Sequence, residues 1–178
     1  MKLIIIDRDG VINQGTDDEI KSASEWQALP GSLPAISRLS QNGFRIIVAL
    51  NQAENKKRKL DIIKLNEIHQ KLLDHLSQYG GTIDAFFFCP HEPREKCSCR
   101  KTKAGLLDVI AERLRISLHG VPVVGAEPGY MDAAITAGAI PYFVSPDNNE
   151  EKEKNHDLPS LVRVCDSLDD VVNELIPE

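Results

Sequence analysis

The stretch VPVVGAEPGYMDAAITAGAIPYFV, residues 121–144, decides the fold. It begins with the apolar run VPVV (121–124), turns at a glycine, continues with a short helical pattern over 131–137 and ends in IPYFV (140–144). Continuously apolar runs of this length are typical of strands buried on both faces of a parallel sheet. A strand, a helix and a second strand in close succession form the unit that joins two parallel strands. The segment therefore predicts a parallel sheet that is covered by helices.

The rest of the chain repeats this alternation. Further strands are predicted at 2–6, 44–50 and 84–88, and further helices at 32–42, 58–78, 104–115 and 167–175. Alternating strands and helices favour an α/β fold with three layers, in which helices cover both faces of one sheet. Because 178 residues suffice for one hydrophobic core, we expect a single domain over 1–178.

The composition excludes several classes of protein. Hydrophobic residues make up 42% of the chain and charged residues 27%, as in an ordinary globular protein. A net charge of −6 argues against nucleic acid as the main partner. No apolar run approaches the roughly 20 residues of a membrane span, and the apolar run near the N-terminus is too short for a signal peptide. We therefore expect a cytoplasmic protein without a membrane partner.

Acidic residues follow the first predicted strand in the sequence IIIDRDGVIN. Asp7 leaves the strand, Asp9 comes two residues later, and Gly10 allows a tight turn. One carboxylate of such a pair can attack phosphorus and form an aspartyl-phosphate. The other can protonate a leaving alcohol and later activate water. The pair therefore predicts phosphoryl chemistry at the carboxyl edge of the sheet, where ligands bind in open parallel sheets.

Three cysteines and a histidine gather after the third predicted strand. Cys89, His91, Cys97 and Cys99 follow the pattern C-x-H-x5-C-x-C within eleven residues. Three thiolates and an imidazole complete a tetrahedral zinc set and leave no position for water. The pattern therefore predicts a structural zinc ion, which would fold a loop that has no core of its own.

Polar and basic residues beside these motifs are candidate substrate contacts. Arg100 and Lys101 directly follow the zinc pattern, where two fixed cations suit a phosphorylated substrate. The second strand ends at Leu50 and is followed by Asn51 and Gln52. The basic run 56–59 either extends a phosphate site or is the solvated start of a helix, and we favour the helix start.

Other residues carry less information. His69, His75, His119 and His156 lie on helical or polar segments and are predicted to be surface residues. Cys165 is predicted to be a small core residue. Trp26 could line the substrate side of the first loop or pack in the core, and we favour packing.

The motif D-x-D-G after a buried strand resembles the first motif of the haloacid dehalogenase (HAD) superfamily of phosphohydrolases. Together with N-Q after the second strand and C-P-H with C-x-C-R-K, the chain closely resembles its D-glycero-D-manno-heptose-1,7-bisphosphate 7-phosphatases, a histidinol-phosphatase-like subgroup that serves lipopolysaccharide synthesis. The resemblance covers residues 2 to about 145. It implies a cytoplasmic, magnesium-dependent and usually monomeric enzyme with a minimal cap domain.

The resemblance also implies roles for individual residues. It makes Asp7 the nucleophile and Asp9 the general acid/base, and it places Asn51, Gln52, Arg100 and Lys101 against the substrate. Lys101 would also steady the charge of the nucleophile. The loops are counted by the predicted strand that they follow, so the fourth loop starts at Gly125, after the strand 121–124. Magnesium would be held by Asp7, the backbone carbonyl of Asp9, an aspartate of the fourth loop and the substrate phosphate.

The fourth loop departs from the family pattern. The family has G-D-x-x-x-D after this strand, whereas this chain has Ala126 and Tyr130 at the two aspartate positions. The family also places Ser or Thr where this chain has Leu50. Because the lost carboxylate belongs to a small ligand set, we expect weakened magnesium binding and reduced or lost activity. Glu127, one residue along, is a possible substitute ligand.

Two functional hypotheses therefore stand side by side. The first is a HAD phosphatase that acts on a phosphorylated sugar with altered metal support. The second is a non-catalytic, zinc-stapled HAD-like domain that binds a phosphosugar or a protein partner. The first loop and the cysteine cluster favour the first hypothesis, and the second and fourth loops favour the second. A response-regulator receiver domain would also use acidic loops on a parallel sheet, but it does not explain the zinc pattern.

Overall fold

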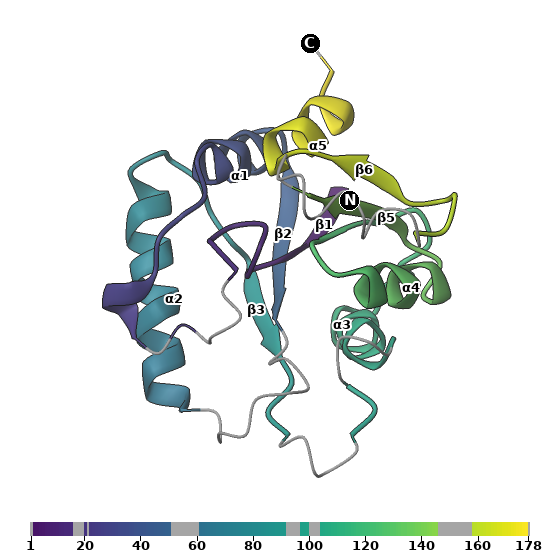
Figure 1. The fold of residues 1–178 in the computed structure, drawn as a ribbon, viewed down its shortest axis with the longest axis horizontal. Helices are drawn as coiled ribbons and strands as arrows, with labels where there is room; N and C mark the ends of the chain where they lie inside the picture. Colours follow the sequence, from purple (N-terminus) through teal and green to yellow (C-terminus); the bar gives the residue numbers. More distant parts are fainter. Residues whose placement is uncertain are drawn as a thin grey trace.

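The computed structural model describes residues 2–15, 20, 22–50, 61–91, 97–99, 104–145 and 158–177. Within these ranges the chain forms a six-stranded sheet in the order β3-β2-β1-β4-β5-β6, and every neighbouring pair of strands is parallel. The strands are β1 (Lys2–Asp7), β2 (Phe44–Leu50), β3 (Ala85–Phe88), β4 (Pro122–Gly125), β5 (Ile140–Val144) and β6 (Arg163–Cys165). The predicted parallel α/β sheet is confirmed (Figure 1).

Helices lie on both faces of the sheet, as Figure 1 shows. They are the 3₁₀ helix η1 (Ala23–Glu25) and the α-helices α1 (Ser32–Gln41), α2 (Ile62–Ser77), α3 (Gly105–Leu114), α4 (Pro128–Thr136) and α5 (Leu168–Leu175). Helices α1, α2 and α5 cover one face, and α3 and α4 cover the other. None of the helices in the described ranges is long and apolar enough to cross a bilayer.

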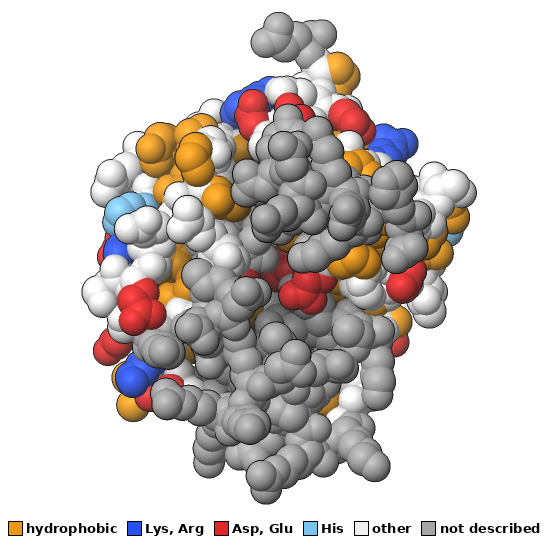
Figure 2. All heavy atoms as spheres, viewed as in Figure 1, with side chains coloured by type: hydrophobic (Ala, Val, Ile, Leu, Met, Phe, Trp, Pro, Cys, Tyr) orange, Lys and Arg blue, Asp and Glu red, His pale blue; other side chains and the backbone are white. Residues whose placement is uncertain are grey.

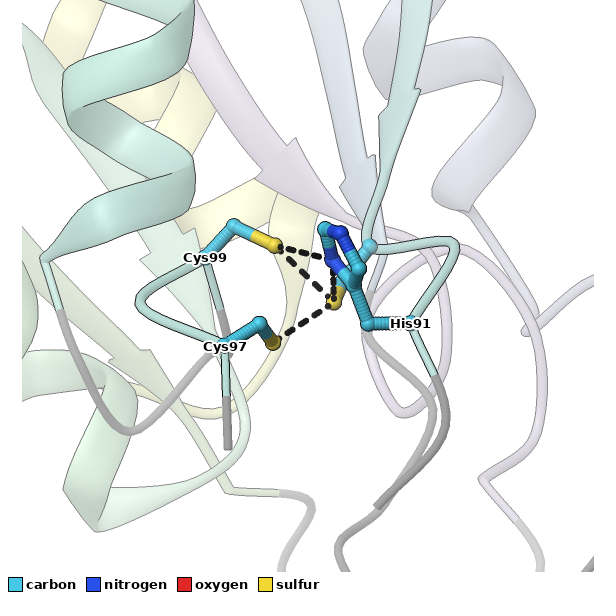
Figure 3. A group of neighbouring side chains, drawn as sticks. His91, Cys97 and Cys99 are labelled. Atoms are coloured by element: carbon cyan, nitrogen blue, oxygen red, sulfur yellow. Dashed lines mark hydrogen bonds between the residues drawn. The ribbon is translucent and has the colours of Figure 1, made fainter. Parts of the chain in front are cut away.

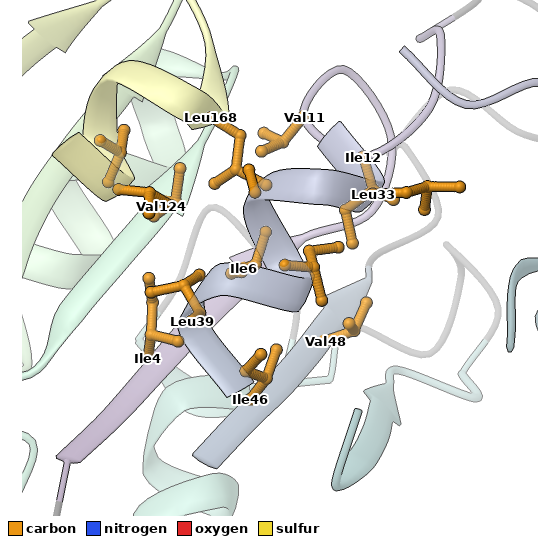
Figure 4. Packing of buried hydrophobic residues seen from close by; sticks show 14 of the residues in the cluster. Ile4, Ile6, Val11, Ile12, Leu33, Leu39, Ile46, Val48, Val124 and Leu168 are labelled. Atoms are coloured by element: carbon orange, nitrogen blue, oxygen red, sulfur yellow. The ribbon is translucent and has the colours of Figure 1, made fainter. Parts of the chain in front are cut away.

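The core is divided by the sheet into two clusters. Successive residues of a strand point to opposite faces, so Ile4 and Ile6 of β1 join the cluster under α1, α2 and α5 (Figure 4). Leu3 and Ile5 join the cluster under α3 and α4. Burial on both faces explains why β1 is apolar from Leu3 to Ile6.

Two helices begin at other residues than predicted from the sequence. Helix α2 begins at Ile62 rather than at residue 58, because the Asp61 carboxylate accepts hydrogen bonds from the backbone N–H groups of Ile63 and Lys64. Helix α4 begins three residues before the predicted start, because Pro128 occupies its first turn. Proline is well suited to that place, since its φ is already helical and its missing N–H is not needed there.

Strand β6 and helix η1 were not predicted from the sequence. Strand β6 has only three residues, its central Val164 is 49% exposed, and it lies at the edge of the sheet. A short edge strand needs no continuous apolar run, so it gives little signal. Cys165, at its end, is buried, as predicted.

The strand order reverses beside β1. From β1 the chain moves outward through β2 to β3 on one side, and β4 then begins the other side. The carboxyl ends of β1 and β4 therefore meet at a topological switch point, the usual place for a ligand in such a sheet. The loops that start at Asp7 and at Gly125 both leave from this point.

Candidate functional site

Asp7 is the last residue of β1 and is 1% exposed. The chain turns directly after it: Gly10 adopts φ +81°, its N–H donates to the carbonyl of Asn13 at 2.8 Å, and the N–H of Ile12 donates to the carbonyl of Arg8 at 2.9 Å. A glycine is favoured here because other residues rarely adopt this φ. In the space-filling view, acidic side chains are visible near the centre of the molecule (Figure 2).

Asp9 is held by two neighbours in the same loop. The Arg8 guanidinium makes a two-point contact, from Nε to Oδ1 at 2.9 Å and from Nη2 to Oδ2 at 3.2 Å. The Asn13 amide also donates to Oδ1 at 2.9 Å. The Asp9 side chain remains 32% exposed, whereas Arg8 is 3% exposed. The loop therefore presents one buried and one partly exposed carboxyl group in a fixed arrangement.

The first and fourth loops touch. A Cβ built on Gly10 would lie 2.9 Å from the Cβ of Ala126. A longer side chain at position 126 would therefore start beside the first loop. Ala126, which replaces an aspartate of the family pattern, thus lies at the boundary between these two loops.

Tyr130 lies in the core rather than at the surface. It is 1% exposed and belongs to the cluster under α3 and α4. Its ring packs on Gly125, where a Cβ would stand 2.5 Å from the ring carbon Cδ1. Burial and then the negative charge of Asp7 raise the pKa of the Tyr130 hydroxyl well above its usual value. An aromatic ring therefore stands within electrostatic reach of Asp7, at a position where the family pattern has a carboxylate.

The donors that remain fit magnesium only in part. Asp7 and Asp9 supply oxygen atoms, but positions 126 and 130 supply no carboxylate. Glu127 is exposed and stands directly before the first turn of α4. Magnesium prefers oxygen ligands in near-octahedral geometry and usually takes one or two carboxylates. The fourth loop thus lacks the ligand that the family pattern provides.

The other predicted substrate contacts are only partly described. Leu50 ends β2 and is 3% exposed, so its side chain belongs to the core and offers no hydrogen bond. Asn51, Gln52, Arg100 and Lys101 lie outside the described residues, as does the basic run 56–59.

The cysteine and histidine cluster is assembled as predicted. The ligand atoms of Cys89, His91, Cys97 and Cys99 all lie within 4.8 Å of one another. Figure 3 shows the side chains of His91, Cys97 and Cys99 turned toward a common centre. The Cys89 Sγ lies 3.4 Å from that of Cys97 and 3.1 Å from that of Cys99, and the His91 Nδ1 lies 3.0 Å from the Cys99 Sγ.

These distances fit a single ion with ligand bonds of about 2.0–2.3 Å, so the cluster can bind zinc. Burial, followed by the hydrogen bonds to Cys89 and Cys97, raises the pKa of the Cys99 thiol to about 12. A divalent cation would allow the crowded thiols to ionise together.

One histidine beside the first loop is buried, contrary to the prediction from the sequence. His69 was predicted to be a surface histidine, but it is only 7% exposed and its ring stacks on Phe86 with a centroid distance of 4.0 Å. Its position gave a usable signal. It lies four residues after Leu65 and three before Leu72, on the buried stripe of α2.

The packing of Trp26 is confirmed: it is 2% exposed, and its Nε1 donates to the Asn13 Oδ1 at 3.1 Å.

Known proteins resemble the chain over its whole length. A D-glycero-beta-D-manno-heptose-1,7-bisphosphate 7-phosphatase from Bordetella bronchiseptica is 44% identical over 178 residues, which is 100% of this chain and 99% of that protein. No protein-family model matches the chain.

One solved structure supports the same relationship, and a second shares the fold. A D,D-heptose 1,7-bisphosphate phosphatase from B. bronchiseptica, complexed with magnesium and phosphate, is 44% identical, covers 98% of each chain and has a TM-score of 0.90. A haloacid dehalogenase-like hydrolase from Streptococcus pneumoniae is 10% identical, covers 99% of each chain and has a TM-score of 0.65, which shows a shared fold.

Proposed function

The chain belongs to the family of D-glycero-D-manno-heptose-1,7-bisphosphate 7-phosphatases in the HAD superfamily, and we propose that it is a phosphomonoester hydrolase with a heptose bisphosphate as its substrate. The observation that carries this proposal is the first loop. It combines a buried Asp7 at the end of the central strand with an Asp9 that Arg8 and Asn13 hold two residues away.

In this reaction each carboxylate has its own role. Asp7 attacks the phosphorus atom, and the bond from phosphorus to the sugar oxygen breaks as Asp9 gives its proton to that oxygen. Asp9, now ionised, takes a proton from water, and the resulting hydroxide attacks the aspartyl-phosphate. Phosphate leaves, and both side chains return to their starting states. Asn51, Gln52, Arg100 and Lys101 contact the substrate in this proposal.

We propose that turnover is reduced in this chain because of the fourth loop. Ala126 and Tyr130 supply no carboxylate for magnesium, which would neutralise charge as Asp7 approaches the anionic phosphate. Leu50 gives no hydroxyl to the phosphoryl group. Loss of a single stabilising group of this kind costs about 100- to 1000-fold in rate. Glu127 is the nearest acidic side chain in sequence that could hold the ion in place of an aspartate at 126.

The second candidate function is a non-catalytic domain that binds a phosphosugar or a protein partner. The burial of Tyr130 favours it, because a ring within electrostatic reach of Asp7 changes the part of the site where the family pattern has a carboxylate. In this alternative Asp7 and Asp9 shape a binding site without forming a covalent intermediate.

Phosphate release decides between the two functions. The substrate is heptose 1,7-bisphosphate with magnesium, and the control variant is Asp7→Asn, which keeps the shape of the side chain and removes its charge. Turnover clearly above the control supports the phosphatase. Equal rates, with zinc bound and the fold intact, support the non-catalytic domain.

The remaining parts of the proposal concern the state of the protein. We propose that residues 1–178 act as one domain and as a cytoplasmic monomer, with neither nucleic acid nor a membrane as a partner. The net charge of −6 and the resemblance to the family support this view. Size-exclusion chromatography with light scattering would test the monomer.

A further inference from the structure

Arg8, the residue between the two aspartates, has a second partner behind it. Its Nη1 lies 3.3 Å from the Nε2 of His69, which is 61 positions away in the sequence. The guanidinium carries only donors, so the Nε2 atom must accept and the proton of the neutral ring must be on Nδ1. Arg8 therefore contacts Asp9 through Nε and Nη2, and His69 through Nη1.

The histidine itself is fixed in place. It lies on the buried stripe of α2, and its ring stacks on Phe86 of β3 with planes 13° apart. Burial, followed by the positive charge of Arg8, lowers the pKa of His69 to about 4, and the charge of Asp9 opposes this shift. The ring is therefore neutral near pH 7 and remains an acceptor for Arg8.

We propose that His69 is a positioning residue, which holds the Asp9 carboxylate in one orientation through Arg8. A free arginine side chain samples many rotamers, and a two-point contact fixes a carboxylate only if the guanidinium is itself fixed. His69 supplies that support from a helix and a strand outside the loop. The role of Asp9 as the group that protonates the leaving oxygen rests on the function proposed above, but the contact between His69 and Arg8 does not.

The first test observes Arg8 directly. In ¹⁵N spectra of the full chain, the Nε–Hε signal of Arg8 reports whether the side chain is held, through its rate of exchange with water. In His69→Leu an apolar side chain fills the same place but has no hydrogen-bond acceptor. We expect this variant to speed the exchange by about tenfold or more. His69→Gln, which can still accept a hydrogen bond, should exchange more slowly than His69→Leu. The matched control is His119→Leu, at an exposed histidine outside the network.

An unchanged Arg8 signal in His69→Leu would overturn the proposal, as would equal exchange in the leucine and glutamine variants. If His69→Leu does not fold, the comparison of His69→Gln with the natural chain decides: an Arg8 signal that keeps its slow exchange supports the proposal, and a lost signal contradicts it.

The second test asks whether the positioning serves the leaving group. An alkyl phosphate needs a proton at the leaving oxygen, whereas p-nitrophenyl phosphate does not. We expect His69→Leu to lower kcat/KM for the alkyl substrate about tenfold and kcat/KM for p-nitrophenyl phosphate less than about twofold, because this ratio reports the step that releases the leaving group and not the later hydrolysis, in which Asp9 acts on both substrates alike. Equal losses on both substrates would mean that His69 has only a structural role. Absence of turnover in every variant, the natural chain included, would refute the phosphatase and leave the Arg8 spectra to decide the positioning.

Discussion

The loops after β1 and β4 meet at Gly10 and Ala126, yet they are built in opposite ways. In the first loop polar groups hold one another: Arg8 and Asn13 both contact the Asp9 carboxylate. In the fourth loop the corresponding space is apolar, with a methyl group at Ala126 and a buried ring at Tyr130. Chemistry on phosphate needs both loops, because the group that attacks and the group that neutralises charge come from different strands. The first loop thus keeps its polar contacts, whereas Tyr130, on the side of the fourth loop, is packed in the core.

The cysteine and histidine cluster is like the first loop in one respect: the residues of both match the sequence pattern of the family. We expect its removal to have the largest effect on stability, because structural zinc binds with a free energy on the order of 10 kcal/mol and part of that folds the loop. Chelation, or Cys97→Ser, should lower the melting temperature by about 10 °C or more.

Cys165→Ser is the matched control, because Cys165 lies outside the cluster. Metal analysis should find one zinc per chain in the control and none in Cys97→Ser. A melting temperature of Cys97→Ser equal to that of the natural chain would show that the cluster does not stabilise the fold.

Tyr130 tests whether the fourth loop has become part of the core. Because its ring is fully buried, Tyr130→Ala should lower the free energy of unfolding by about 3–5 kcal/mol, the range for removing a large aromatic side chain. Tyr130→Phe keeps the ring and should cost less than about 1.5 kcal/mol. Urea unfolding measures both values. A loss below about 1 kcal/mol for Tyr130→Ala would contradict a packing role.

Restoring the fourth loop should recover activity. Ala126→Asp places a carboxylate beside Gly10, and Leu50→Thr supplies the missing hydroxyl. We expect the double variant to release phosphate at least about 100-fold faster than the natural chain, and only with magnesium present. Steady-state kinetics at several magnesium concentrations provide the measurement.

The control for this experiment is Ala126→Asn with Leu50→Thr, which has nearly the same shape without the charge. If aspartate and asparagine give the same rate, the loss of a carboxylate is not what limits the natural chain. Unfolding must be measured in parallel, because Leu50 is buried and threonine adds a polar group there.

The sequence predicted those parts of the molecule that depend on short, strong patterns. Five of the six strands appear as largely apolar runs, because most of their residues are buried or partly buried on both faces of the sheet. The zinc cluster is local in sequence, so its spacing was sufficient. The network behind Asp9 could not be read in the same way. His69 is 61 residues from Arg8, and only the fold shows that α2 brings the two together.

The smallest predicted effect concerns this same histidine and the stability of the folded chain at acidic pH. The pKa of His69 is about 4 in the folded chain and 6.5 as its ordinary value, so between these pH values the unfolded chain binds more protons. Stability therefore rises with pH through this window and is lost on acidification. The glutamine in His69→Gln cannot take up a proton, so the contribution of residue 69 to the pH dependence of unfolding is absent from this variant. All other titrating groups contribute to both proteins.

We expect the stability of the natural chain relative to His69→Gln to fall by on the order of 2 kcal/mol between pH 7 and pH 4.5. Urea unfolding of both proteins at the two pH values measures this difference. A difference that stays constant would mean that His69 has the same pKa in the folded chain as in the unfolded chain, and a difference that grows on acidification would mean that the ring is protonated in the folded chain. Either result would contradict the burial of a neutral His69 ring against Arg8 and would remove the support that we assign to the Asp9 carboxylate in the first loop.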